Sequence, residues 1–241
     1  MYMSPLPFKQ NLTDGTYLYG WKSEPSLTPF APSYTHYFSE KKIFSEEECR
    51  EWNDFLLKQE KILLDKYRTT MGAGGTGLSA NSITSRFPYF NVLKFNFHYI
   101  ERLKTEIFKG IQKILDVSGH STWQETLYAN SWFNVIRKGE GMDTHIHSYD
   151  KNTFYGFHLN INVIETFTSY FHPVKFQEES FHTPNKIGYL TLFPDFIPHR
   201  VSLNRYETPR VSIAGDIYAS SRLKQPGLGP IQLAEIGNTK E

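Results

Sequence analysis

The spacing of apolar residues separates a helical region from a strand-rich region. Between residues 45 and 66, apolar side chains recur every three or four positions, which is the spacing of one helix face. Ser45 and Glu48 form a capping-box signature, so we expect this helix to begin there. A second amphipathic helix is predicted over residues 96–115. Its apolar positions are Ile100, Leu103, Ile107, Ile111 and Ile114.

From residue 123 onward the pattern changes to short β-rich runs separated by turn residues. We expect eight strands, at residues 127–136, 143–148, 153–163, 168–177, 180–182, 187–193, 199–203 and 210–218. Eight strands of this kind fit a double-stranded β-helix (a cupin-like jelly roll), with the two helices packed outside one sheet. The predicted fold class is therefore mainly β with N-terminal helices.

The length of 241 residues favours one domain with extensions over two domains. Residues 1–40 are rich in Pro, Ser and Tyr and are expected to form an extended arm on the surface. We therefore expect residues 1–122 to supply this arm and the supporting helices, residues 123–220 the jelly-roll core, and residues 221–241 a trailing tail. The glycine-rich run 71–77 lacks the end of a phosphate loop and is expected to be a flexible connection or lid.

Charge and composition exclude several classes of function. The 26 Lys and Arg residues nearly balance the 25 Asp and Glu residues, so no field favours nucleic acid or an anionic membrane. No basic leader segment or membrane-length apolar window is present in the sequence, so a soluble cytoplasmic protein is expected. Cys49 is the single cysteine and is surrounded by glutamates, which favours a structural role over a nucleophilic one.

The strongest candidate chemistry lies in three histidines. On a strand, residues two apart face the same side, so His145 and His147 can share one metal ion. His199, fifty-two residues after His147, can complete the site from a neighbouring strand. Three neutral imidazole nitrogens suit Fe, Zn, Cu or Ni. Arg210, eleven residues after His199, could hold the carboxylate of an acidic cosubstrate through two parallel hydrogen bonds.

Several runs of residues together resemble the 2-oxoglutarate- and Fe(II)-dependent oxygenases. They are Asn130-Ser131-Trp132-Phe133-Asn134, Gly139, His145-Ile146-His147, Gly156, residues 188–194, His199 and Arg210-Val211-Ser212. The resemblance covers residues 123–218 and is greatest to oxygenases of phages and marine bacteria distantly related to prolyl hydroxylases. It implies that His145 and His199 bind Fe(II), and that Arg210 and Ser212 bind the far carboxylate of 2-oxoglutarate. It also implies hydroxylation of an unidentified substrate by dioxygen, with succinate and CO2 as coproducts.

His147 departs from the pattern of this family, in which a carboxylate is usual at that position. A neutral imidazole there raises the net charge of an Fe(II) site from about +1 to about +2, which changes its redox potential and anion affinity. We take His145, His147 and His199 as the expected ligands. Asp143 and Asp150 flank the pair, and either could ligate the metal or accept an imidazole N–H.

Two other functions agree with the same residues. A cupin-type dioxygenase would use the three histidines without 2-oxoglutarate, and Arg210 would then bind the carboxylate of the substrate. A noncatalytic jelly roll would keep the histidines as a closed structural zinc site. Of the remaining histidines, His158 lies on a predicted strand and is expected to be a hydrogen-bonded core residue.

Overall fold

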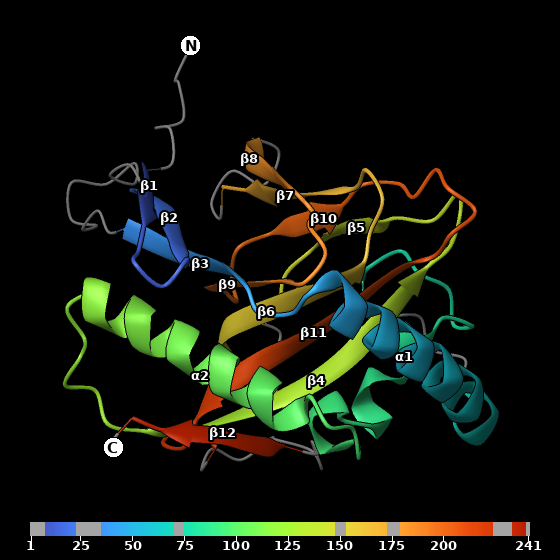
Figure 1. The fold of residues 1–241 in the computed structure, drawn as a ribbon, viewed down its shortest axis with the longest axis horizontal. Helices are drawn as coiled ribbons and strands as arrows, with labels where there is room; N and C mark the ends of the chain where they lie inside the picture. Colours follow the sequence, from blue (N-terminus) through green and yellow to red (C-terminus); the bar gives the residue numbers. More distant parts are fainter. Residues whose placement is uncertain are drawn as a thin grey trace.

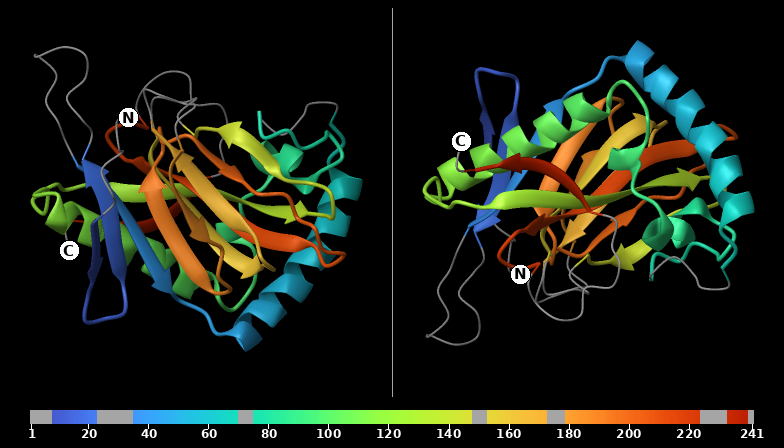
Figure 2. Two further views of the ribbon diagram at one scale, coloured as in Figure 1. Left: turned by 90° about the horizontal axis from the view of Figure 1, so that it is seen from above. Right: turned by 90° about the horizontal axis from the view of Figure 1, so that it is seen from below.

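The computed structural model describes residues 8–22, 35–69, 75–147, 153–172, 179–223 and 233–239. Its strands form two antiparallel sheets, and the smaller sheet lies over one face of the larger (Figures 1 and 2). The larger sheet has the strand order β1-β2-β3-β9-β6-β11-β4-β12, and the smaller has the order β5-β10-β7-β8. The strands are β1 (Phe8–Asn11), β2 (Tyr17–Lys22), β3 (Thr35–Lys42), β4 (Thr126–Ile136), β5 (Met142–His145), β6 (Thr153–Asn162), β7 (Phe167–Phe171), β8 (Glu179–Pro184), β9 (Tyr189–Pro194), β10 (His199–Val201), β11 (Arg210–Ala219) and β12 (Ala234–Asn238).

The strands from β4 to β11 alternate between the two sheets in the manner of a jelly roll. Strands β4, β6, β9 and β11 are neighbours in the larger sheet, whereas β5, β7, β8 and β10 make up the smaller sheet. The chain therefore crosses from one sheet to the other at nearly every connection. The predicted fold class, a mainly β double-stranded β-helix, is confirmed.

All eight strands expected after residue 123 are present, but β5, β6, β7 and β10 end earlier than predicted, and the early end of β5 bears on the candidate site. Strand β5 stops at His145, and the backbone N–H of His147 donates to the carbonyl of Asp195 instead of continuing the ladder with β10. The position of His145 therefore follows from its place on strand β5, whereas the position of His147 is set by the turn that follows the strand. The sequence pattern could not show this, because the hydrogen bond joins residues far apart in the chain.

Strands also occur where the sequence predicted none. Strands β1, β2 and β3 extend the larger sheet beyond β9, and Ser39 pairs with Leu192 in the β3–β9 ladder. Strand β12 pairs with β4, so this part of the predicted tail does not trail. The described part of the predicted surface arm is therefore built into the sheet, and the expectation of a trailing tail is wrong for residues 234–238. The division at residues 122 and 220 remains a prediction.

Two helices cover the outer face of the larger sheet (Figures 1 and 2). Helix α1 (Glu46–Lys66) begins with the predicted capping box, in which the Glu48 carboxylate accepts from the Ser45 backbone N–H at 2.7 Å. Helix α2 (Ile100–Val117) carries the apolar positions expected from its sequence. Both helices contribute to one core with the sheet, because their buried faces supply Trp52 and Ile107 to the same cluster.

The alternation of side chains along β4 and β11 separates this core from a functional face. Odd-numbered residues of both strands pack toward the helices, while even-numbered residues line a cavity between the two sheets. The core-facing residues are Leu127, Ala129, Phe133, Val135, Val211, Ile213, Ile217 and Ala219. The cavity-facing residues are Asn130, Trp132, Asn134, Arg210, Ser212, Ala214, Asp216 and Tyr218. Polar residues on buried strands thus gather on one side of the sheet.

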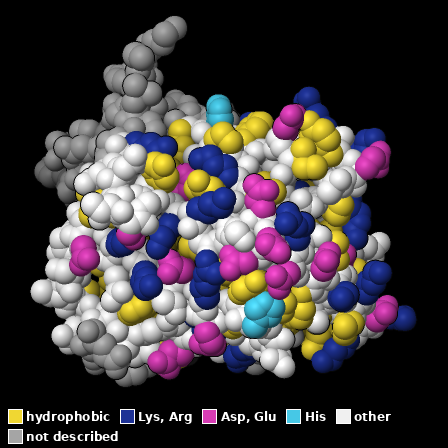
Figure 3. Space-filling view, viewed as in Figure 1, with side chains coloured by type: hydrophobic (Ala, Val, Ile, Leu, Met, Phe, Trp, Pro, Cys, Tyr) yellow, Lys and Arg dark blue, Asp and Glu magenta, His cyan; other side chains and the backbone are white. Residues whose placement is uncertain are grey.

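The surface agrees with the balanced charge of the chain. On the face that carries α1 and α2, basic and acidic side chains are interspersed (Figure 3). Within the described ranges, none of the helices has the length and apolar character needed to cross a membrane.

Candidate metal centre

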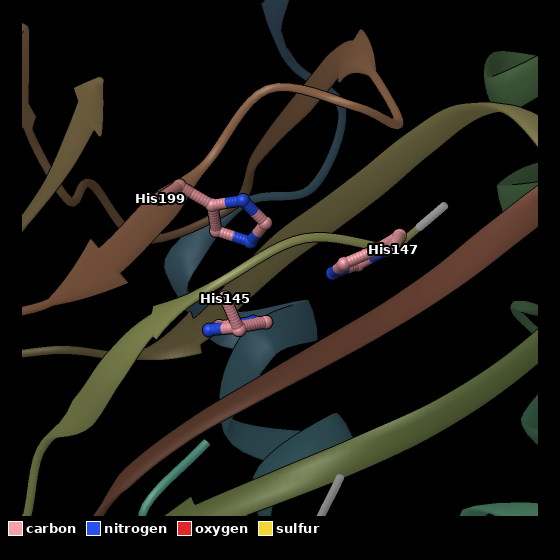
Figure 4. A group of neighbouring side chains, drawn as sticks. All are labelled: His145, His147 and His199. Atoms are coloured by element: carbon pink, nitrogen blue, oxygen red, sulfur yellow. The ribbon is translucent and has the colours of Figure 1, made fainter. Parts of the chain in front are cut away.

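His145, His147 and His199 lie around a common space between the sheets (Figure 4). His145 is the last residue of β5 and His199 is the first residue of β10, and the two are paired across the antiparallel ladder. One potential ligand atom from each of the three residues lies within 4.8 Å of the others. The structure therefore brings together the three histidines that the sequence selected, at spacings that suit a shared ion.

Hydrogen bonds fix the orientation of all three imidazoles. The Nδ1 atom of His145 lies 2.7 Å from the carbonyl oxygen of Asp143, and that of His199 lies 3.0 Å from the carbonyl oxygen of Ile197. The Nδ1 atom of His147 lies 2.6 Å from a carboxylate oxygen of Asp216. These oxygens can only accept, so we assign the ring proton to Nδ1. Each Nε2 atom then keeps its lone pair, which is the form a metal requires.

Burial keeps two of the three histidines uncharged. It lowers the pKa of His145 to about 4, with a smaller contribution from the neighbouring His147. Burial likewise holds the pKa of His199 well below its usual value, and the other two histidines act in the same direction. Both imidazoles are therefore neutral near pH 7, and no proton has to leave them before an ion can bind.

The aspartates near the cluster take different roles. Asp143 supplies its backbone carbonyl to His145, and its carboxylate is not part of the histidine cluster. Asp150 lies outside the described residues. Asp216, which the sequence analysis missed, bonds His147 from β11. Its signal in the sequence is a lone carboxylate within an otherwise buried strand.

Arg210 lies in the same cavity, which has a volume of about 470 Å³. Its side chain donates to Ser212 Oγ and to Asn160 Oδ1, each at 3.1 Å, and its Nε has no partner. Arg210 is only 3% exposed, and no carboxylate within the described ranges forms an ion pair with it. Burial lowers the pKa of Arg210 to about 10, so the guanidinium is still charged near pH 7. A buried, unneutralised cation of this kind can bind an anion.

Ser212 can add a second donor to an anion at this position. Its Oγ accepts from Arg210 and lies 3.5 Å from the side-chain nitrogen of Asn134. The oxygen of the Asn134 amide accepts in turn from Thr84 at 2.8 Å, which fixes the orientation of the amide. Since Ser212 accepts from both neighbours, its own hydroxyl hydrogen remains for a ligand.

His158 is buried and hydrogen-bonded, as expected of a core residue, but it also lines the cavity. Its Nε2 lies 3.0 Å from the hydroxyl oxygen of Tyr170, which the sequence analysis did not select. Burial, and then the charge of Arg210, lower the pKa of His158 to about 3. The ring is therefore neutral beside the guanidinium.

No protein-family model matches the chain, and no curated protein matches it. Solved structures with similar folds include a prolyl-4-hydroxylase from Pseudomonas putida, with 10% identity and a TM-score of 0.46 over 75% of this chain and 91% of that one. The α-ketoglutarate-dependent epimerase SnoN from nogalamycin biosynthesis is 12% identical, with a TM-score of 0.48 over 82% and 88% of the two chains. A prolyl hydroxylase from Trichoplax adhaerens is 12% identical, with a TM-score of 0.45 over 78% and 87%.

Proposed function

We propose that this protein is an Fe(II)- and 2-oxoglutarate-dependent oxygenase that hydroxylates a substrate still to be identified. One observation carries the proposal: a cluster of three histidines shares one cavity with a buried arginine that no carboxylate of the described residues neutralises. The histidines match the donors that iron accepts, and the arginine matches the anionic end of a dicarboxylate.

The histidine cluster fits a metal that keeps open coordination positions. His145, His147 and His199 would supply three nitrogens, and the cavity beside them leaves room for other ligands. Fe(II) bound here, together with 2-oxoglutarate and dioxygen, would supply the oxidising chemistry and yield succinate and CO2 as coproducts. The protein's own contribution is to orient the imidazoles through hydrogen bonds to Asp143, Asp216 and Ile197. Burial keeps His145 and His199 neutral.

Arg210 and Ser212 would bind the far carboxylate of 2-oxoglutarate. The guanidinium supplies charge and donors, and the Ser212 hydroxyl supplies one more hydrogen. Asn160 holds one guanidinium nitrogen, so the side chain is oriented before an anion arrives. Apolar walls strengthen the electrostatic attraction between the guanidinium and a carboxylate, since charges interact more strongly where water is excluded. Phe193 forms such a wall, with its ring centroid 4.7 Å from that of His199.

A cupin-type dioxygenase that needs no 2-oxoglutarate is the second candidate. The observation that favours it is the histidine-only cluster, which contains no carboxylate within the described residues. Arg210 would then bind the carboxylate of the substrate itself. A closed structural zinc site receives less support, because the histidines border a cavity.

The test begins with protein purified without oxygen and loaded with one equivalent of Fe(II). Titration with 2-oxoglutarate should produce a visible metal-to-ligand charge-transfer band, and admission of air should then produce succinate. The variant His199→Ala should give neither signal, while Cys49→Ser, which changes a buried residue of α1, should give both. Tight iron binding without the band would favour the cupin-type dioxygenase over the proposed function.

A further inference from the structure

Phe193 packs against two of the three histidines. The residue lies on β9 and is fully buried. Its ring centroid lies 4.7 Å from that of His199 and 5.5 Å from that of His147, and the ring planes are inclined at 66° and 73°. The centroids of His147 and His199 are themselves only 5.0 Å apart. The place of the Phe193 ring therefore bears on the separation of the two imidazoles.

Gly156, on β6, leaves the space that this ring occupies. It pairs with Phe193 in the β6–β9 ladder and with Asp216 in the β6–β11 ladder. A Cβ atom added at Gly156 would lie 2.9 Å from the Cε2 and Cζ atoms of Phe193 and 3.1 Å from Nδ1 of His147. Nonbonded carbon atoms pack at about 3.5–4.0 Å. The Phe193 ring and the His147 nitrogen therefore both enter space that any side chain at position 156 would take.

Space, and not backbone conformation, explains the glycine at this position. Gly156 is not one of the described glycines with a positive φ. Glycine weakens a strand, because it loses more conformational freedom on folding than other residues and offers no side chain to pack. A glycine in the interior of a strand therefore often marks a place where another group approaches closely. Here the closely approaching groups belong to the candidate metal centre and its support.

The groups around Gly156 have little freedom to move aside. The Phe193 ring lies in an aromatic cluster and has no exposed surface. The Nδ1 atom of His147 is held by Asp216 at 2.6 Å. Protein interiors are packed as densely as organic crystals, so an inserted methyl group must displace one of its neighbours. A shift of Phe193 would disturb its contact with His199, and a shift of His147 would strain its bond to Asp216.

We propose that Gly156 and Phe193 form a positioning pair for the metal centre. The missing side chain of Gly156 admits the Phe193 ring, and the two residues together set the place of the His147 imidazole relative to that of His199. Neither side chain has an atom that binds a metal, so both act through the histidines. The inference deepens the proposed function, since it rests on the histidine cluster, but it depends on neither 2-oxoglutarate nor turnover.

Titration of the full-length, metal-free protein with Co(II) tests the pair, because the visible absorption bands of Co(II) change with its coordination geometry. Gly156→Ala should weaken Co(II) binding about ten- to a hundredfold, the usual range when a ligand loses its support, and should alter the bands. The control Gly110→Ala also places a Cβ against a buried side chain, that of Leu192, but in the helix-facing core. It should bind Co(II) like the wild type, even where it lowers the free energy of unfolding.

The double variant Gly156→Ala/Phe193→Leu tests whether the two residues share one space. Leucine lacks the ring atoms that the new Cβ would meet, so the double variant should bind Co(II) more tightly than Gly156→Ala. Residues that acted independently would give the opposite order, with the double variant weaker than either single variant. That order would overturn the proposal. So would a wild-type affinity and spectrum for Gly156→Ala, or an equal loss of affinity in Gly110→Ala.

Phe193→Leu alone decides the matter if Gly156→Ala does not fold. It should change the Co(II) bands, because the ring that packs on His147 and His199 is lost. The control Phe133→Leu makes the same change in the helix-facing core and should leave the bands unchanged. Wild-type bands in Phe193→Leu would overturn the proposal.

A measurement without metal separates this inference from the proposed function. The Nδ1 proton that His147 donates to Asp216 should give a downfield NMR signal, which should move in Gly156→Ala but not in Gly110→Ala. A wild-type protein that bound neither Co(II) nor Fe(II) would count against the proposed function, and the proton signal would still test the role of Gly156. An unmoved signal in Gly156→Ala would overturn that role.

Discussion

The imidazole of His147 and the carboxylate of Asp216 are joined by a hydrogen bond of 2.6 Å, and their side chains are only 6% and 14% exposed. His147 stands where the oxygenases that this sequence resembles usually have a carboxylate. Asp216 therefore supplies the negative charge that a carboxylate ligand would otherwise provide. The imidazole of His147 separates this charge from the metal position. A carboxylate that accepts from a metal-bound imidazole orients the ring and makes it a stronger ligand.

Replacing Asp216 with Asn should weaken metal binding about ten- to a hundredfold, which is the usual cost of losing such a partner. The amide keeps the size of the side chain but removes the negative charge. Anaerobic titration with Fe(II), repeated with Zn(II), measures the change. The midpoint potential of the bound iron should also rise, since less negative charge is left to stabilise the oxidised metal.

Asp195→Asn is the matched control for this change. Asp195 is also a buried carboxylate near the site, but it accepts from Thr153 at 2.7 Å rather than from an imidazole. The control should bind metal like the wild type. Equal metal affinities for Asp216→Asn and the wild type would show that the carboxylate does not act through His147.

Single substitutions of the histidines test the ligand set. His145→Ala and His199→Ala should each lose tight binding of about one equivalent of Fe(II), because two nitrogens hold the ion poorly. His147→Ala should also impair metal retention, whereas His147→Asp should keep iron and 2-oxoglutarate decarboxylation. Anaerobic titration measures the affinities. Normal iron binding by His147→Ala, together with a loss in Asp143→Ala, would transfer the third ligand to Asp143.

Removal of the Arg210 guanidinium should weaken 2-oxoglutarate binding about thirty- to a thousandfold. The basis is a charge-assisted contact to a buried guanidinium, worth roughly 2–4 kcal/mol. Arg210→Lys keeps the charge but loses the planar fork, so its affinity should lie between those of the wild type and Arg210→Ala. Titration of the charge-transfer band measures each affinity, while iron binding should stay unchanged.

Arg137→Ala serves as the control for a lost arginine. Its guanidinium forms an ion pair with Glu60 of α1, and Arg137 does not line the cavity. This variant should bind 2-oxoglutarate like the wild type. If Arg210→Ala also did so, the far carboxylate would have to bind elsewhere.

Mild acid should destabilise the metal-free protein through His158. Its pKa is about 3 in the folded state, against about 6.5 in an unfolded chain, so below pH 6.5 the unfolded state binds a proton that the folded state excludes. The stability linked to this residue is complete above pH 6.5 and is lost as the pH falls toward 3. Between pH 7 and pH 5 the loss should be about 2 kcal/mol.

Urea unfolding of the metal-free protein at pH 7 and pH 5 measures this loss. His158→Gln can keep a hydrogen bond with Tyr170 but cannot titrate, so its free energy of unfolding should fall less over the same interval. The burial of His145 and His199 should leave some pH dependence in the variant. Identical pH dependence in the variant and the wild type would assign the whole effect to other groups.

Local patterns in the sequence were sufficient to predict the helices and the jelly-roll strands. The capping box at Ser45 and the three- or four-residue spacing in α2 depend on neighbours within one or two turns, which a sequence displays directly. The histidines, Arg210 and Ser212 were selected because strand parity and motif spacing are also local properties. The structure shows, in addition, that all of these residues line one cavity.

Contacts between distant segments decided the rest. Strands β3 and β12 form on edges offered by β9 and β4, which lie far along the chain, and β2 and β1 then extend the sheet from β3. The Pro-, Ser- and Gly-rich composition of these segments concealed the strands. The bond from Asp216 to His147 joins residues 69 positions apart, and it determines which nitrogen of that ring can face a metal. Within the described residues, the lack of a carboxylate beside Arg210 likewise depends on everything packed around the guanidinium. The sequence determined which residues could carry the chemistry, and only tertiary packing determined their protonation and their orientation.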